Sequence, residues 1–308
     1  MSLSAMERLW VTLDYRYLLP LLARLPRPLG RQLAAARGWL YARLERDWRQ
    51  FSFDDTELAA RTRRAHAEIL GAVPTQCLER SFRRRYVMQS LEELEAAWLM
   101  ASRLEAIPVR YEGAEAVRQA LASNGRVVFL IAHAASNLLG TVFLRTFGVP
   151  VLGMSSNVVD DPRVPVPVGK FFRQKYAHMS RWLEGGGIVD RQGNTRRFVK
   201  FLQTPGMVVV VGDLPPDPGE AVLYHGFLGQ RRGFASGAAR LAELSGAALM
   251  SFSCQYADGG FVVRFSEKGE HPLDFIQRQV APDPGVWWAA DLLPLYPLAE
   301  AAAPPSTG

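Results

Sequence analysis

Long hydrophobic runs are missing from this 308-residue sequence. Near the amino terminus, the longest uncharged apolar stretch covers only residues 17–23, whereas a helix needs roughly 18 to 20 such residues to cross a bilayer. The amino terminus also lacks the basic, apolar and small-residue zones of a secretion signal. We therefore expect no transmembrane helix and a cytoplasmic location.

Cysteine and lysine are scarce. Cys77 and Cys254 have no second cysteine near them in the sequence, which excludes a CxxC site and a disulfide framework and indicates a reducing compartment. Arginine supplies nearly all of the positive charge, because the only lysines are Lys170, Lys175, Lys200 and Lys268.

Basic residues outnumber acidic ones by 36 to 30, which gives a formal net charge of +6. Most of the excess lies in residues 1–110, with 18 Lys plus Arg against 13 Asp plus Glu. Such a surface suits anionic membranes, nucleic acids or acidic carrier proteins. The sequence has no zinc knuckle, aromatic ribonucleoprotein motif or separate basic tail, so we expect no nucleic-acid partner.

The common nucleotide, hydrolase and metal motifs are absent as well. No Gly-Lys-Ser/Thr loop opens a helix, no GxGxxG follows a predicted strand, and no GxSxG elbow occurs. His178, His225 and His271 show no metal-ligand spacing with one another. We therefore expect neither a metal nor a resident cofactor.

Two all-apolar runs, residues 127–131 and 207–211, predict strands that are buried on both faces. His133 comes just after the first run and Asp213 just after the second. Open α/β sheets bind their ligands at the carboxyl ends of the strands. Position alone leaves His133 catalytic or structural, and Asp213 free to orient a base, bind a hydroxyl or cap a turn.

Strand and helix patterns alternate through the middle of the chain. They predict an α/β fold: a single domain with a mixed, mostly parallel central sheet flanked by helices, plus amino-terminal helices. Residues 247–256 and 260–265 predict a hairpin turning at Asp258-Gly259, and residues 223–232 a glycine-rich loop. We expect a helical region at 1–105 that packs on the core, an α/β core at 106–298 and a disordered tail at 299–308.

The first 50 residues predict at least two amphipathic, arginine-rich helices. Such helices lie on a membrane surface in some proteins, and in others their apolar faces cover a sheet. The pattern leaves both possibilities open. The apolar positions are Leu9, Leu13, Tyr17, Leu33, Trp39, Leu40 and Leu44.

Several blocks between residues 91 and 288, taken in order, resemble one family. They are Glu112-Gly113, Asn124-Gly125-Arg126, the strand with His133, Gly206-Met-Val-Val-Val-Val-Gly212-Asp213, Phe227-Leu-Gly229, Gly237-Ala-Ala-Arg240-Leu-Ala242, Ser245-Gly246-Ala247 and the pair Trp287-Trp288. This series is similar to the bacterial lipid A biosynthesis lauroyl/myristoyl acyltransferases of the wider glycerolipid acyltransferase superfamily.

The resemblance implies that His133 is a general base that takes the proton from an attacking hydroxyl. The family signature places an acid five residues after this histidine, often as His-x-Gly-Asn-Trp-Glu. Here that position is Leu138. Either the protein is a degenerate acyltransferase or a binding protein, or another group orients the histidine, for which Asn137 and Asp213 are the candidates.

The implied activity is transfer of an acyl chain from a thioester of acyl carrier protein or coenzyme A to a hydroxyl or amine. The alternative is a non-catalytic protein that binds acyl chains or acyl carrier protein. The resemblance implies a link to the inner membrane, where members of the family are usually held by an amino-terminal span. Since we expect no such span here, the protein is either soluble or peripheral at the cytoplasmic face, through its amino-terminal helices. The residues predicted to bind substrate are Ser136, Arg191, Phe227, Gly229 and Arg231.

Overall fold

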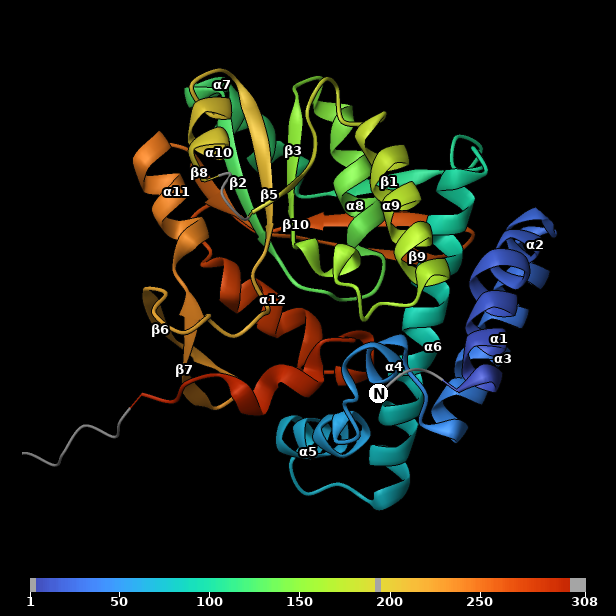
Figure 1. Ribbon diagram of the computed structural model, residues 1–308. Coiled ribbons are helices and arrows are strands. Elements are labelled where there is room, and N and C mark those ends of the chain that lie inside the picture. The colour runs from blue at the N-terminus through green and yellow to red at the C-terminus, as the bar shows by residue number, and fades with distance from the viewer. Residues whose placement is uncertain (1–3, 192–194, 300–308) are drawn as a thin grey trace, which may run out of the picture.

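Five parallel strands form the central sheet, in the order β4-β3-β5-β2-β8, and helices cover both of its faces (Figure 1). This computed structural model describes residues 4–191 and 195–299, and it confirms the predicted α/β class. The predicted disordered tail lies, from residue 300 on, outside the described residues. The strands are β2 (Arg126–Ile131), β3 (Val151–Ser155), β4 (Gly187–Asp190), β5 (Gly206–Val211) and β8 (Ala248–Met250).

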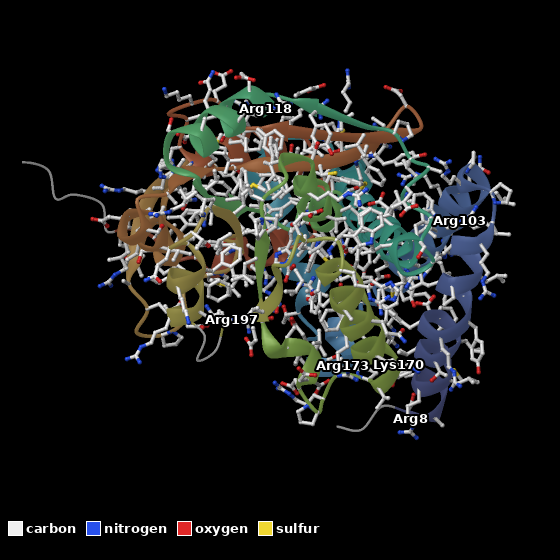
Figure 2. All side chains as sticks on the ribbon, turned by 90° about the horizontal axis from the view of Figure 1, so that it is seen from above. Arg8, Arg103, Arg118, Lys170, Arg173 and Arg197 are labelled. Carbon is white, nitrogen blue, oxygen red and sulfur yellow. The ribbon has the colours of Figure 1, made fainter. Side chains whose placement is uncertain are left out.

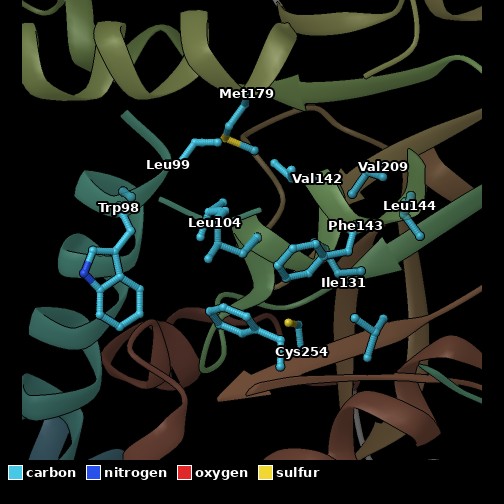
Figure 3. Close-up of a cluster of buried hydrophobic side chains, with 14 of the residues drawn as sticks. Trp98, Leu99, Leu104, Ile131, Val142, Phe143, Leu144, Met179, Val209 and Cys254 are labelled. Atoms are coloured by element: carbon cyan, nitrogen blue, oxygen red, sulfur yellow. The ribbon is translucent and has the colours of Figure 1, made fainter. Parts of the chain in front are cut away.

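The central strands are apolar on both faces because each face packs against its own core. Along β2, Val127, Phe129 and Ile131 belong to one hydrophobic cluster, and the alternate residues Val128 and Leu130 belong to the other. Side chains alternate across a strand in this way. The sheet therefore separates two cores, and Figure 3 shows part of the first, with Ile131 among its labelled side chains.

A second sheet contains β1 (Val109–Glu112), β10 (Gly260–Phe265) and β9 (Phe252–Ala257). The predicted hairpin at Asp258-Gly259 is confirmed, and both turn residues have positive φ. Its first strand is not continuous, however, because residues 248–250 leave it to join the central sheet as β8. Ser251 marks the break, where its hydroxyl donates to Leu130 O at 2.7 Å.

The predicted glycine-rich loop at 223–232 is wrong. These residues lie in an antiparallel hairpin of β6 (Val222–Phe227) and β7 (Gln230–Ala235). The turn residues Leu228 and Gly229 both have positive φ, as a tight hairpin turn requires. Leu-Gly is a weak turn signal, and Val222 and Leu223 are exposed, so the sequence shows neither a strong turn nor a buried strand.

Helix α6 (Thr75–Met100) stands between the sheet and the amino-terminal helices (Figure 1). Gly38 of α3 permits the close contact, since a Cβ there would lie 2.6 Å from Val87 Cα of α6. The other helices are α1 (Ala5–Leu13), α2 (Leu19–Arg24), α3 (Arg27–Leu44), α4 (Trp48–Phe53), α5 (Leu58–Leu70), α7 (Ala114–Asn124), α8 (Asn137–Phe143), α9 (Val166–Ser180), α10 (Thr195–Phe201), α11 (Gly237–Ser245) and α12 (Pro272–Val280).

The apolar positions singled out in the first 50 residues do not cover the sheet. Tyr15, Leu19 and Leu22 turn inward instead, toward α6 and α9. No helix in the described ranges is long and apolar enough to span a bilayer. The exposed positions, each with more than a third of its surface accessible, are Leu9, Leu13, Tyr17, Leu33, Trp39, Leu40 and Leu44.

Candidate active site

His133 and Asp213 meet at the carboxyl edge of the sheet. Strands β2 and β5 are parallel neighbours in the register Ile131 to Val211, so each of the two residues lies two positions beyond its strand. The separation of His133 Nδ1 from Asp213 Oδ1 is 2.8 Å. The sequence placed both residues at strand ends, and the register of two adjacent strands brings them into contact.

Three donors hold the Asp213 carboxylate, which is 3% exposed. Oδ1 accepts from the His133 ring, and Oδ2 accepts from the His133 backbone N–H and from Trp287 Nε1, both at 2.6 Å. An ionised carboxylate only accepts hydrogen bonds, so the imidazole carries its proton on Nδ1. This arrangement leaves Nε2 as the basic nitrogen available to a substrate.

The pair Trp287-Trp288 fixes the histidine from its other side. Ala134 forms a β-bridge with Trp287, and Trp288 N donates to His133 O at 3.1 Å. The Trp288 ring lies against the imidazole, with 4.3 Å between ring centroids. Arg85 of α6 donates to Trp288 O at 3.1 Å, so α6 supports this contact.

The residues near the family's acid position take no part in holding the imidazole. Leu138 lies on α8 and lines the adjacent cavity. Asn137 is 1% exposed, and neither polar atom of its side chain has a hydrogen-bond partner within the described ranges. Of the two groups predicted to replace the acid, the structure brings Asp213 to the imidazole and not Asn137.

A cavity of about 700 Å³ lies beside His133. Its walls use residues from both cores, such as Val209 of one and Val210 of the other, so it extends around the sheet edge onto both faces. We call one part the α9 arm, lined by Gln89, Glu92, Glu93, Phe172, Lys175, Tyr176 and Met179. The other is the α11 arm, lined by Leu130, Phe198, Ala238, Arg240 and Leu241.

Only one of the five residues predicted to bind substrate lines this cavity. Arg191, at the end of β4, does so, but its guanidinium is paired with Asp217 and with Glu220 at 3.1 Å. Ser136 is 2% exposed and hydrogen-bonds to the Glu95 side chain.

The remaining three predicted residues belong to the β6–β7 hairpin. Phe227 is buried in the core against Phe234 and Trp287. Gly229 occupies the turn with φ +79°, and Arg231 is exposed on β7. None of the three is part of the cavity wall.

Sequence reasoning gave no role to several groups that line the cavity. Lys175 and Glu92 form a buried pair in the α9 arm, and exposed Arg240 lines the α11 arm. A usable signal exists for Glu92, because it stands with two other glutamates, Glu93 and Glu95, in an otherwise apolar helix segment. No pattern in the sequence points to its partner on α9.

His225 and His271, far apart in the sequence, come together with Asp274. The two rings are stacked, 4.0 Å apart and 11° from parallel, so their in-plane lone pairs run side by side and do not converge on one point. His225 Nε2 lies 2.8 Å from Asp274 Oδ1. This arrangement suits a hydrogen bond between His225 and Asp274, with His271 stacked on His225, better than a metal centre.

Comparisons with known proteins agree with the geometry. Residues 3–279 match the family model for bacterial lipid A biosynthesis acyltransferases. A search of curated proteins finds no match. Since the family match covers most of the 308 residues, the chain belongs to the bacterial lipid A biosynthesis acyltransferase family.

Proposed function

We propose that the protein moves an acyl chain from a thioester of acyl carrier protein or coenzyme A to a hydroxyl or amine, with His133 as general base. The observation that carries this proposal is the contact between His133 Nδ1 and Asp213 at 2.8 Å, beside a largely apolar cavity. Because Asp213 supplies a carboxylate to the imidazole, the loss of the family acid at Leu138 does not require a loss of catalysis.

The reaction follows from the proton positions. His133 Nε2 takes the proton of the acceptor hydroxyl or amine as the acceptor atom attacks the thioester carbonyl carbon. The resulting imidazolium donates to Asp213, which stabilises its positive charge. When the tetrahedral intermediate collapses, the carbon–sulfur bond breaks and the imidazolium returns the proton to the leaving thiolate. The products are an ester or amide and a free thiol.

The basic charge of the chain supports an anionic donor. Exposed Arg240 on α11 lines the cavity, and both carrier-protein and coenzyme A thioesters carry phosphate next to the pantetheine arm. A guanidinium binds phosphate with two parallel hydrogen bonds. We place the donor, with its acyl chain, at the α11 arm.

The exposed apolar residues of the amino-terminal helices support contact with a membrane surface. Leu9, Leu13 and Tyr17 are each more than half exposed, and exposed Arg16 and Arg24 lie on the same part of the chain. Apolar side chains with neighbouring arginines are the composition of helices that bind anionic lipid surfaces. The helices concerned are grouped on one side of the molecule (Figure 1).

The test incubates purified protein with a labelled acyl thioester and a panel of alcohols and amines, comparing wild type with His133→Ala. We expect transfer by the wild type and a large loss in the variant. Undiminished transfer by His133→Ala would contradict the assignment of the base. No turnover in the wild type, together with tight binding of acyl carrier protein, would favour the alternative of a non-catalytic binding protein.

A further inference from the structure

The two arms of the cavity differ in chemistry. In the α11 arm, the groups nearest the sheet, Val210, Phe198 and Leu241, are apolar and buried. The α9 arm contains three charged side chains, Glu92, Glu93 and Lys175, all buried. A hydrocarbon chain suits the first arm, while charged groups in the second need polar partners.

The charge of Glu93 is already satisfied by protein groups. Its Oε1 accepts from the Tyr15 hydroxyl and its Oε2 from Arg37, both at 2.7 Å. These bonds tie Glu93 to the amino-terminal helices. Each oxygen of Glu93 therefore has a partner, and Arg37 compensates its charge within the protein.

Lys175 and Glu92 are less completely satisfied. Lys175 is 2% exposed, and its ammonium lies 3.4 Å from Glu92 Oε1, a long contact that takes one of its three donors. The rings of Phe172 and Tyr176 lie 4.4 and 5.6 Å from the ammonium, and rings cannot replace a hydrogen-bond acceptor. The pair is neutral as a whole and offers both a donor and an acceptor.

A hydroxyl group complements this pair. Its oxygen accepts from the Lys175 ammonium, and its hydrogen is donated to the Glu92 carboxylate. An anionic group is disfavoured because Glu92 repels it, and a methylene chain leaves the pair without a partner. We infer that Lys175 and Glu92 form a subsite for a neutral hydroxyl group of the acceptor, a substrate class that rests on the proposed function.

Helix α6 contributes both to the surroundings of His133 and to the subsite. Arg85 contacts the backbone of Trp288, whose ring lies against His133. Glu92 lies seven residues further along the same helix, or about 10 Å at the rise of an α-helix. The hydroxyl bound at the subsite is a second hydroxyl of the acceptor, separate from the group that is acylated at His133.

The acceptor, and not the donor, fits the α9 arm, because the donor's phosphate and acyl chain match the α11 arm. Arg240 stands there beside apolar Phe198 and Leu241. The two substrates then approach His133 from opposite faces of the sheet. The imidazole at the sheet edge is the common point of the two arms.

The experiment measures binding by isothermal titration calorimetry with pairs of medium-chain probes, a 1-alkanol and the α,ω-alkanediol of the same length. Removing only Lys175 would leave the Glu92 carboxylate buried and unpaired, so the variant is the double change Lys175→Met with Glu92→Gln. We expect the wild type to prefer the diol by about tenfold, the effect of one hydroxyl bonded to charged groups. The double variant should lose this preference.

Lys170→Met is the matched control, because Lys170 lies on the same helix but is exposed at the rim of the molecule (Figure 2). This control makes the same lysine-to-methionine change away from the cavity, so the variant should still prefer the diol. His133→Ala should also keep the diol preference, since this change removes the proposed general base and leaves Lys175 and Glu92 in place. Equal affinity of the wild type for both probes, no binding of either, or a preference that survives in the double variant would overturn the subsite.

The same proteins separate this inference from the proposed function. A wild type that prefers diols but transfers no acyl chain would contradict the proposed function and leave the subsite in place. Acyl transfer that depends on His133, without any diol preference, would overturn the subsite alone.

Discussion

Asp213 is the residue whose replacement most directly tests the catalytic arrangement. Both of its oxygens accept from N–H groups, Oδ1 from His133 Nδ1 and Oδ2 from two further donors. In Asp213→Asn, an amide NH₂ that faces Nδ1 donates to it and forces the imidazole proton onto Nε2, which can then no longer accept. We expect kcat for acyl transfer to fall by about 10³- to 10⁴-fold, measured under saturating thioester.

Leu138→Glu provides the comparison for Asp213→Asn, since it restores the family's acid in the sequence. The new carboxylate would enter an apolar part of the cavity wall, while Asp213 already holds the imidazole. We expect no gain in kcat. Activity within tenfold of the wild type for Asp213→Asn would show that the histidine does not depend on this carboxylate.

His66 predicts a loss of stability in mild acid. The ring is fully buried, neither nitrogen has a partner within the described ranges, and burial together with nearby Arg85 lowers its pKa to about 3. The unfolded state binds a proton below pH 6.5, while the folded state resists protonation down to the lower value. This difference removes stability as the pH falls from about 6.5 toward 3, by about 1.4 kcal/mol at pH 5.5.

The measurement is urea unfolding at pH 7.5 and 5.5 for wild type and His66→Leu. The variant should lose about 1.4 kcal/mol less than the wild type over this interval. His178 and His271, whose pKa values burial also lowers, are unchanged in both proteins and cancel in the comparison. Equal losses would mean that His66 is already protonated, or is solvated, in the folded state.

At the level of residues, the sequence predicted those site residues whose positions follow directly from the strands. Runs of valine identify β2 and β5, so the positions of His133 and Asp213 beyond them follow from local pattern. The contact of Trp287 with Asp213 and the pairing of Lys175 with Glu92 join segments 74 and 83 residues apart. No local periodicity encodes such partners, and the same is true of the burial of Phe227.

Helix α6 is the element on which the site and the amino-terminal region both depend. It supports Trp288 through Arg85, and seven residues further on it supplies Glu92 to the cavity. Helix α3 crosses it closely at Gly38, where an added Cβ would meet the backbone of Tyr86 and Val87 at 2.6 to 2.9 Å. Backbone atoms cannot move aside as a side-chain end does.

Gly38→Ala should therefore destabilise the protein although alanine favours helix formation by about 1 kcal/mol. Overpacking against a fixed neighbour costs about 1 to 3 kcal/mol, so we expect a lower urea midpoint. Gly237→Ala, at the open first position of α11 with nothing within 4 Å, is the control and should be neutral or stabilising. Equal midpoints for the two variants would contradict close packing of α3 on α6.

Secondary structure was predicted best where one signal decides it. The turn at Asp258-Gly259 combines a residue that tolerates positive φ with a glycine, and the hairpin formed as predicted. The strand break at Ser251 has no such signal, because residues on both sides are apolar. Which sheet each half joins depends on partners from β2 and β10, which only the folded chain provides.

For the molecule as a whole, the amphipathic pattern of the first 50 residues correctly predicted helices. It did not show whether their apolar faces pack on the sheet or contact a membrane. The structure resolves part of this ambiguity, because the positions that seemed suited to cover the sheet are exposed. The residues of this region that are buried are Tyr15, Leu19 and Leu22, which turn inward toward α6 and α9. Exposed apolar side chains that gather on one surface mark contacts with a partner or a membrane in other proteins.

A lipid surface is the partner that we propose, and it predicts liposome binding through the amino-terminal helices. The variant replaces Leu9, Leu13 and Tyr17 with serine, which removes apolar contact without touching buried residues. We expect partitioning onto anionic vesicles to fall by at least about tenfold, since losing even part of the burial of three such side chains exceeds about 1.4 kcal/mol. Flotation with vesicles of phosphatidylglycerol and phosphatidylethanolamine measures it.

The matched control changes three exposed apolar residues elsewhere, Val166, Leu244 and Leu295, to serine. It lowers overall surface hydrophobicity by a similar amount and should leave binding unchanged. Added salt should weaken vesicle binding of the wild type and of the control alike, because it screens the arginines. The serine variant already binds weakly, so salt should change its binding little. Equal flotation of the serine variant and the control would exclude the amino-terminal helices as the membrane contact.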